Sequence, residues 1–494
     1  MKTMLRAADN QVKSGRLLQG ERPKRPSQSQ TFRLAPFAFR LAQARPGSHR
    51  LAFAGVYLFT LLLYMRPNDL FPELLGTFPL VKIVAIATPL VYVASKLGTG
   101  QRLITWPLEM KMVVVITALC VVFMPIAVSA QDSQNLFLDV FLKVVIIFVL
   151  LVNLLDTRER LCALFKLVVI CGVALALGAI KRYLAGEFTM VSTLAGESLE
   201  KGIRIEGIVS GMFGNPNDLA TALNLLLPLA VILALLHRGM ARLLYFGGAV
   251  VLAMGVIVTF SRGGFLGLMA AAGVMLWKFG RRNRMVTVVA ALLAVMVLAL
   301  SLPGGYGARL STILHIEQDQ TGSAQERAEL LERAAQVAAR HPVVGVGMGN
   351  FHIYSVNEKE AHNSYLEIAA ELGAMGLVAY LVLIFAPLRS LRRIELQTAR
   401  AQDTLGRAHY YLSVGLQATM VAYMVCSFFT SIEYLWYLYY TVAYAVSLRH
   451  IHAAAETQFP EAGRGAKTVG APRRSGLTKG VLWKTPRLPS GNEC

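Results

Sequence analysis

The sequence predicts an all-α integral membrane protein of about twelve transmembrane helices, with one large periplasmic loop that contains an amphipathic helix. Hydrophobic residues make up 55% of the 494 residues and charged residues only 16%. Soluble domains carry roughly a quarter charged residues. Apolar runs of about twenty residues, the length that crosses a bilayer, recur from Leu51 to Leu448. Only a bilayer solvates that much apolar surface, so a soluble protein is excluded.

The predicted helices follow from the apolar runs and from the polar breaks between them. They cover 51–65, 79–96, 108–129, 136–154, 161–182, 217–236, 241–260, 264–279, 285–303, 366–388, 409–430 and 433–448. Together they form a transmembrane domain over 49–452. Residues 1–48 are polar and basic, and residues 453–494 are rich in Gly, Pro, Arg and Lys. Both segments are predicted to be disordered cytoplasmic extensions.

The net charge of +20 could suggest nucleic-acid binding, but its distribution argues against that function. Basic residues gather in the two terminal segments and in alternate short loops, as the positive-inside rule describes. These loops are 96–102, 156–160, 237–242, 278–284 and 389–407. We therefore expect a multi-pass protein of a bacterial inner membrane with both termini in the cytoplasm. The long loops 183–216 and 303–365 then face the periplasm, and membrane lipids are the expected partners of the basic tails.

The second long loop is expected to contain its own helix. Ser323 and Glu326 have the spacing of a capping box at a helix start. Leu330, Leu331 and Ala334 then recur at helical spacing until His341-Pro342 ends the pattern. The apolar stripe of this helix is expected to lie on the membrane or to pack over the bundle.

Arg262 is the first candidate site residue, because it stands in the tight turn Ser261-Arg-Gly-Gly264 between two apolar segments at the outer side. Ionisable groups at membrane depth are usually functional, which favours anion binding. The adjacent glycines are expected to leave the guanidinium uncovered. The alternative is an Arg that reaches lipid phosphates or pairs with a helix-end carboxylate. Arg204 is a second candidate, although an Arg in a loop is a weaker signal.

Asn217 and Asp218 open a predicted helix, and helix N-capping accounts for both residue types. The same helix N-terminus also suits an anionic head group, so both residues are candidates for substrate binding.

His362 stands just before a predicted transmembrane helix and is followed by Asn363, Glu367 and Glu371 at i, i+4 spacing. Buried carboxylates are costly unless they are paired or reach water. A His near carboxylates binds protons more tightly and can act as a base or an acid near neutral pH. The alternative for His362 is a helix-entry residue bonded to the backbone.

Two other patterns are interpreted without a function. The glycines between Gly345 and Asn350 resemble a phosphate loop, but the P-loop lysine is absent, so a turn is predicted. The acids Glu317 and Asp319 are interpreted as part of a solvated loop, and no metal site is expected.

The segments Asn215–Ala220, Ser261–Gly264, His341–Phe351 and His362–Glu367, with Gly373 beyond them, resemble in this order the O-antigen ligase and polymerase superfamily. The likeness covers about 200–385. It implies an enzyme that acts in the periplasm on an undecaprenyl-diphosphate-linked glycan, without a metal or another cofactor. Arg204 and Arg262 match arginines expected to hold the diphosphate, and His362 matches the expected base.

Three branches of the superfamily differ in their acceptor. A ligase joins the glycan to lipid A-core, a polymerase lengthens the glycan on its carrier, and a third branch glycosylates protein hydroxyls. The ligase branch is preferred, because His362 and the single long loop before it fit that branch.

The chemistry is coherent from the residues alone. A sugar C1 bonded to diphosphate has a good leaving group, whose charge arginines neutralise well in a site of low dielectric. A base then takes the proton of the attacking hydroxyl, and attack opposite the diphosphate inverts the anomeric centre. The rival class is a lipid or polysaccharide transporter, with Glu367 and Glu371 as coupling carboxylates. A transporter predicts broken helices and related halves, and the sequence shows neither feature.

Overall fold

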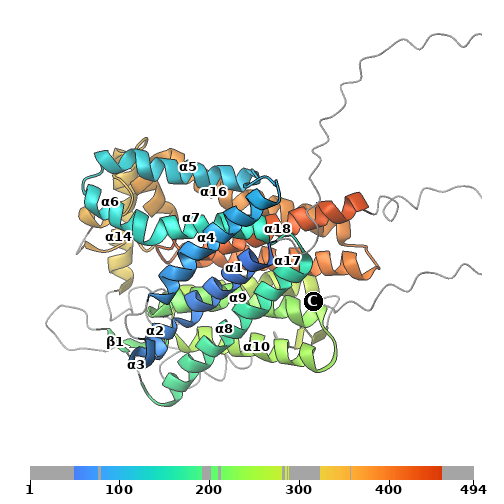
Figure 1. Ribbon diagram of the computed structural model, residues 1–494. Helices are drawn as coiled ribbons and strands as arrows, with labels where there is room; N and C mark the ends of the chain where they lie inside the picture. The colour runs from blue at the N-terminus through green and yellow to red at the C-terminus, as the bar shows by residue number, and fades with distance from the viewer. Residues whose placement is uncertain are drawn as a thin grey trace, which may run out of the picture. The chain divides into compact units, whose positions relative to one another are not determined.

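A computed structural model of the chain describes residues 49–75, 79–187, 189–191, 202–209, 213–280, 284–285, 287–288, 323–355 and 358–458. All of these residues belong to one unit, Arg45–Cys494, and the remaining unit, Met1–Ala44, lies outside them. Most described residues are helical (Figure 1).

The first half of the described chain contains α1 (Arg50–Met65), α2 (Pro67–Leu70), α3 (Pro72–Leu75), α4 (Leu80–Gly98), α5 (Leu108–Phe123), η1 (Met124–Ile126), α6 (Ala130–Leu136), η2 (Phe137–Phe141), α7 (Leu142–Leu154), α8 (Arg158–Leu184), β1 (Thr189–Val191) and β2 (Gly202–Arg204). The second half contains α9 (Pro216–Leu236), α10 (Gly239–Val258), α11 (Arg262–Met275), η4 (Leu276–Gly280), α14 (Ser323–Arg340), α15 (Phe351–Tyr354), α16 (Ser364–Thr398), α17 (Thr404–Cys426) and α18 (Trp436–Gln458).

The structure confirms an all-α membrane protein. Eight described helical stretches are long and apolar enough to cross a membrane. Eleven of the predicted segments coincide with described helices, and the twelfth, 285–303, lies almost wholly outside the described residues. The predicted loop helix is present as α14, which ends at Arg340 as His341-Pro342 requires. The short hairpin of β1 and β2, inside a segment expected to be a loop, was not predicted.

Helix α9 forms the centre of the bundle. Its side chains are apolar on all sides, which is typical of a fully enclosed helix. In an 18-residue apolar stretch of α9, 89% of the residues are buried, whereas in the corresponding stretch of α4 only 11% are buried. It packs against α8, α10, α11 and α17, and Figure 1 shows α8, α9 and α10 side by side. Gly255 makes this packing possible, because a Cβ there would lie 2.7 Å from both Ala176 and Leu223.

Helix α16 is broken near its start. Gly373, its tenth residue, has φ 66° and ψ −167°, outside helical geometry. Residues 342–347 cross the break and satisfy the backbone groups that it frees. Val346 and Gly347 N–H donate to Ala370 and Glu371 C=O at 2.9 Å, and Ala374 N–H donates to Pro342 C=O at 2.7 Å. The glycine pattern predicted as a turn is therefore part of a strap over a broken helix, and we call residues 342–350 the strap.

Asn350 ties the other end of the strap to α6. Its side-chain oxygen accepts the Ser129 N–H at 2.6 Å, and its nitrogen donates to Ser133 Oγ at 2.8 Å. Ser133 in turn donates to the Met348 C=O at 2.7 Å. Since Asn350 and Ser133 are fully buried, these bonds are shielded from water. The strap thus joins α6 to the break in α16.

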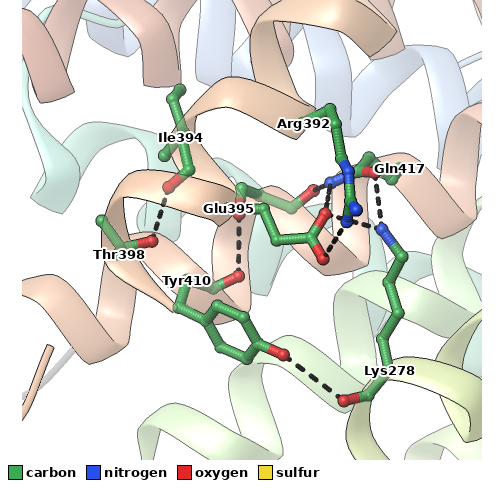
Figure 2. A network of polar contacts seen from close by, with 8 residues as sticks. Lys278, Arg392, Ile394, Glu395, Thr398, Tyr410 and Gln417 are labelled. Atoms are coloured by element: carbon green, nitrogen blue, oxygen red, sulfur yellow. Dashed lines mark hydrogen bonds and ion pairs between the residues drawn. The ribbon is translucent and has the colours of Figure 1, made fainter. Parts of the chain in front are cut away.

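We call the end of the bundle where α9, α11 and α16 begin the site end, and the end where α11 and α16 finish the opposite end. At the opposite end, Lys278 donates to Glu395 at 2.6 Å and to Gln417 at 2.8 Å (Figure 2). Arg392 also pairs with Glu395 at 2.6 Å. This network fastens η4, α16 and α17 together.

A second ion pair lies at the opposite end. Glu109, in the first turn of α5, has no exposed surface. Both of its oxygens accept from Arg449 of α18 at 2.7 Å, and Arg449 also donates to Ser390 at 3.0 Å. This parallel, two-bond geometry is the strongest that Arg and a carboxylate form.

Candidate functional site

Arg262 is the first residue of α11 and is partly buried. Ser261 caps the helix, and its Oγ accepts the Gly264 N–H at 3.1 Å. The glycines after Arg262 have a packing role that the sequence did not reveal. A Cβ at Gly263 would lie 2.7 Å from Phe429 Cβ, and one at Gly264 would lie 2.5 Å from Ala220 Cβ. They let the Arg262 turn approach α9 and the segment after α17.

The start of α9 lies against this turn. Its N-cap is Asn215, whose oxygen accepts the Asn217 N–H at 2.9 Å, with Pro216 at the first helical position. N-capping therefore does not explain Asn217 and Asp218, contrary to expectation. The Asn217 side-chain oxygen instead accepts from Ser261 Oγ at 2.7 Å, which joins α9 to the Arg262 turn. The C=O of Asp218 accepts from the Tyr437 hydroxyl of α18 at 3.3 Å.

Arg204 ends β2, where its backbone is opposite Thr189 of β1. Its side chain is outside the part of the chain that the structure describes. The residues after it are anchored to the end of α8, because Arg182 donates to the Gly207 C=O at 2.9 Å and to the Glu206 C=O at 3.3 Å. The structure thus places the Arg204 backbone in a hairpin that is fastened to the end of α8.

His362 lies two residues before α16, in the left-handed backbone region with φ 52°. Its neighbours are buried, with Ala361 0% and Asn363 1% exposed, whereas His362 itself is partly buried. Asn363 caps α16 by accepting the Tyr365 and Leu366 N–H groups at 3.0 Å. His362 therefore lies between two buried residues of the chain, Ala361 and Asn363.

Glu367 and Glu371 lie one turn apart on α16, as predicted, and both are buried. Glu367 accepts from the Ala361 N–H at 3.2 Å and from the Ser431 hydroxyl. Glu371 accepts from the Phe351 N–H at 3.2 Å and from the Tyr434 hydroxyl at 2.9 Å. Neutral donors hold both side chains, and within the described residues neither pairs with a Lys or an Arg.

Glu433 adds a third buried carboxyl group, in the connection between α17 and α18. It is 3% exposed, and its Oε2 has no hydrogen-bond partner among the described residues. Burial, together with the nearby Glu371, raises the pKa of Glu433 well above its usual range. The described residues include no group of three or more His, Cys, Asp or Glu that could hold a metal ion.

Residues 427–434, which we call the bridging segment, touch both halves of the site. Phe429 packs on Gly263 beside Arg262. On the other side, the Ser427 C=O accepts the Ser364 N–H at 2.9 Å, and the Phe428 C=O accepts from the Asn363 side chain at 3.2 Å. The Arg262 turn, the start of α9 and the His362 loop are thereby gathered at one end of the bundle.

A comparison with protein-family models finds that residues 247–381 match the model of the O-antigen ligase family. This stretch is similar to the O-antigen ligase family. The match confirms the resemblance seen in the sequence and indicates a bacterial membrane protein with a glycosyltransferase or ligase activity. The family implies a lipid-linked glycan as donor and a glycan or lipid as acceptor. No curated protein matches the sequence.

The O-antigen ligase stretch begins within α10 and ends within α16, so it includes Arg262, the strap and His362. Asn217, Asp218 and the bridging segment lie outside it. The contribution of the bridging segment does not follow from the sequence, because Glu433 stands at the first position of an apolar run that predicts a helix. The available signal was an ionisable residue inside the aromatic run from Phe428 to Tyr440.

Proposed function

We propose that the chain is an O-antigen ligase-like glycosyltransferase that moves a glycan from undecaprenyl diphosphate to an acceptor hydroxyl. One observation supports this most: the bridging segment holds the Arg262 turn and the His362 loop at the same end of the bundle. The proposed cation for the leaving group and the proposed base for the acceptor therefore lie on segments that contact the same bridging segment. The family match lies over both residues.

In this proposal the arginines and the helix starts bind the donor. Arg262 and Arg204 neutralise the diphosphate, and the starts of α9 and α11 direct backbone N–H groups towards it. Asn217 and Asp218 line the donor side, where the Ser261 hydroxyl bonds to Asn217 and joins the start of α9 to the Arg262 turn. Asn363 holds the opposite side of the site next to His362.

The proposed transfer breaks the bond from the sugar C1 to the diphosphate oxygen and forms a bond from C1 to the acceptor oxygen, with inversion. The diphosphate leaves with the bonding electron pair, and the arginines stabilise its charge. His362 takes the proton of the acceptor hydroxyl and later returns it to water. Glu367 supports this base through the loop that its carboxyl group holds. The proposal uses no metal ion and no cofactor.

A ligase differs from the related enzymes in the acceptor molecule that receives the glycan. An O-antigen or exopolysaccharide polymerase and a protein O-oligosaccharyltransferase would use the same site geometry. A strain lacking the chain distinguishes the first two, because free lipid-linked polymer accumulates without a ligase and single repeat units accumulate without a polymerase.

The break in α16 favours a transporter, since broken helices line many transport sites. Two features outweigh it. The strap satisfies the backbone groups of the break, and the candidate residues lie at the helix starts of the site end. The enzyme therefore remains the better proposal.

We also propose that the site end faces the periplasm of a bacterial inner membrane and that both termini are cytoplasmic. A periplasmic reporter inserted within 310–360 should be active, and one inserted within 394–406 should be silent. The reverse pattern would place the site on the cytoplasmic side and overturn this orientation.

His362→Ala tests the transfer mechanism. We expect transfer to fall by about 10²–10⁴-fold, the usual contribution of a general base. Donor binding and the amount of folded protein should stay normal, because the arginines bind the diphosphate. His352→Ala is the matched control, since His352 is a partly buried histidine on the neighbouring α15. Substantial turnover by the His362 variant would remove this residue from the mechanism.

A further inference from the structure

The backbone that follows His362 is held by residues of the bridging segment. Asn363 donates to the Phe428 C=O at 3.2 Å on one side of His362. Ser364 Oγ donates to the Thr430 C=O at 2.8 Å and accepts the Ile432 N–H at 2.9 Å. These bonds fix the start of α16, but they leave the residues before His362 to another contact.

That other contact is made by Glu367. Its Oε2 accepts the N–H of Ala361, the residue directly before His362, at 3.2 Å. The same oxygen accepts from the hydroxyl of Ser431. Ser431 therefore orients the carboxyl group that holds the loop, and the chain of contacts runs from Ser431 through Glu367 to Ala361.

The His362 loop needs such a support. A non-glycine residue with positive φ is strained and persists only where its surroundings enforce it. His362 has φ 52° and its neighbour Ala361 is fully buried. Without the Ser431 bond, Glu367 keeps one hydrogen-bond donor among the described residues, in a buried site that also contains Glu371 and Glu433.

We propose that Ser431 and Glu367 form a positioning pair that sets the place of the His362 imidazole relative to the Arg262 turn. This inference rests on the proposed function and assigns a role to a residue outside the O-antigen ligase stretch. Phe429, two residues before Ser431, packs on Gly263 beside Arg262. One short segment thus sets the separation between the base and the cation.

Ser431→Ala tests the pair in the full-length protein, reconstituted in lipid vesicles. The donor is the lipid-linked glycan extracted from a strain that lacks the chain. We expect kcat to fall about 10-fold or more, because a displacement of the base by about 1 Å can cost 10²-fold. The KM for the donor should stay unchanged, since the arginines bind the diphosphate. Ser431→Thr keeps the hydroxyl and should restore at least half of the lost kcat.

Ser413→Ala is the matched control for folding. Ser413 is fully buried in α17 and its hydroxyl donates to the Tyr410 C=O at 2.9 Å. A kcat that falls in Ser431→Ala, but not in Ser413→Ala, at equal thermal stability supports the positioning role. An unchanged kcat, or a loss matched by a loss of folded protein and not repaired by threonine, overturns it. If the wild-type protein shows no transfer in this assay, the proposed function itself fails. A fully active His362→Ala variant instead removes the base that the pair is proposed to position.

Discussion

The two ends of the bundle bury carboxyl groups in opposite ways. At the opposite end, Glu395 contacts Lys278, Arg392 and Gln417 (Figure 2). Glu109 forms two bonds with Arg449 at the same end. At the site end, the partners of Glu367 and Glu371 among the described residues are hydroxyl and backbone N–H groups. Glu433 leaves one oxygen without a partner among the described residues.

This difference separates carboxyl groups that hold the fold from carboxyl groups that serve a site. A buried charge is tolerated when a cation and further hydrogen bonds compensate for its lost hydration. The opposite end meets this condition, so its carboxylates connect helices. At the site end, three buried carboxyl groups have no Lys or Arg partner among the described residues. One of them, Glu433, has a pKa that burial raises well above its usual range.

The substitution Arg449→Ala tests whether the paired carboxylates hold the fold, and it has the largest expected effect on stability. It leaves the fully buried Glu109 without its cation, and breaking a buried pair costs about 3 kcal/mol. We expect a lower thermal-unfolding temperature in detergent and less folded protein, with normal transfer per folded molecule. The double variant Glu109→Gln with Arg449→Ala removes both charges and should regain most of this loss. Equal stability of the single and double variants would show that Glu109 needs no cation.

Glu433→Gln should have a smaller effect of the opposite sign. Because the folded pKa of Glu433 is raised, the folded protein holds a proton that the unfolded chain has released. The stability of the wild type should therefore be fully present below the unfolded pKa and fall as pH rises towards the folded pKa. Glutamine removes this loss. We expect the variant to unfold roughly 2–4 °C higher at pH 8 and to match the wild type at pH 4.

The paired carboxylate supplies the control for this second experiment. Glu395→Gln should lower the unfolding temperature at pH 8, because it removes the charge that Lys278 and Arg392 bind. A Glu433→Gln variant that is likewise less stable at pH 8 would mean that Glu433 is ionised and compensated. The contrast between the two ends would then disappear.

The sequence predicts the helices well and their ends less well. Apolar length places the helices, because the bilayer demands about twenty apolar residues. It does not place the end of α16, which continues to Thr398 although the apolar run stops near Leu388. Arg389 and Arg392 continue the helix as polar residues, and hydropathy cannot distinguish such an extension from a loop. The break at Gly373 was missed because no periodicity marks a single left-handed residue.

The site shows a similar division. Arg262 and His362 could be predicted, because an ionisable residue at the edge of an apolar helix is costly and therefore noticeable. The bridging segment could not be predicted, since its serine and backbone groups act through contacts with residues more than sixty positions earlier, as in the bond from Ser431 to Glu367. Spacing along one helix predicts neighbours on that helix and says nothing about which loop will face them.

The strap has a consequence for how this chain can change over evolution. It meets α16 at Ala370 and Ala374 and meets α6 through Asn350, so the chain returns to the bundle at a point fixed by its own hydrogen bonds. The residues that come before α14 can lengthen, shorten or change in composition while that return point stays in place. Changes in that loop can therefore accumulate while the residues around His362 keep their geometry. The strap separates variation in the loop from the geometry of the site end.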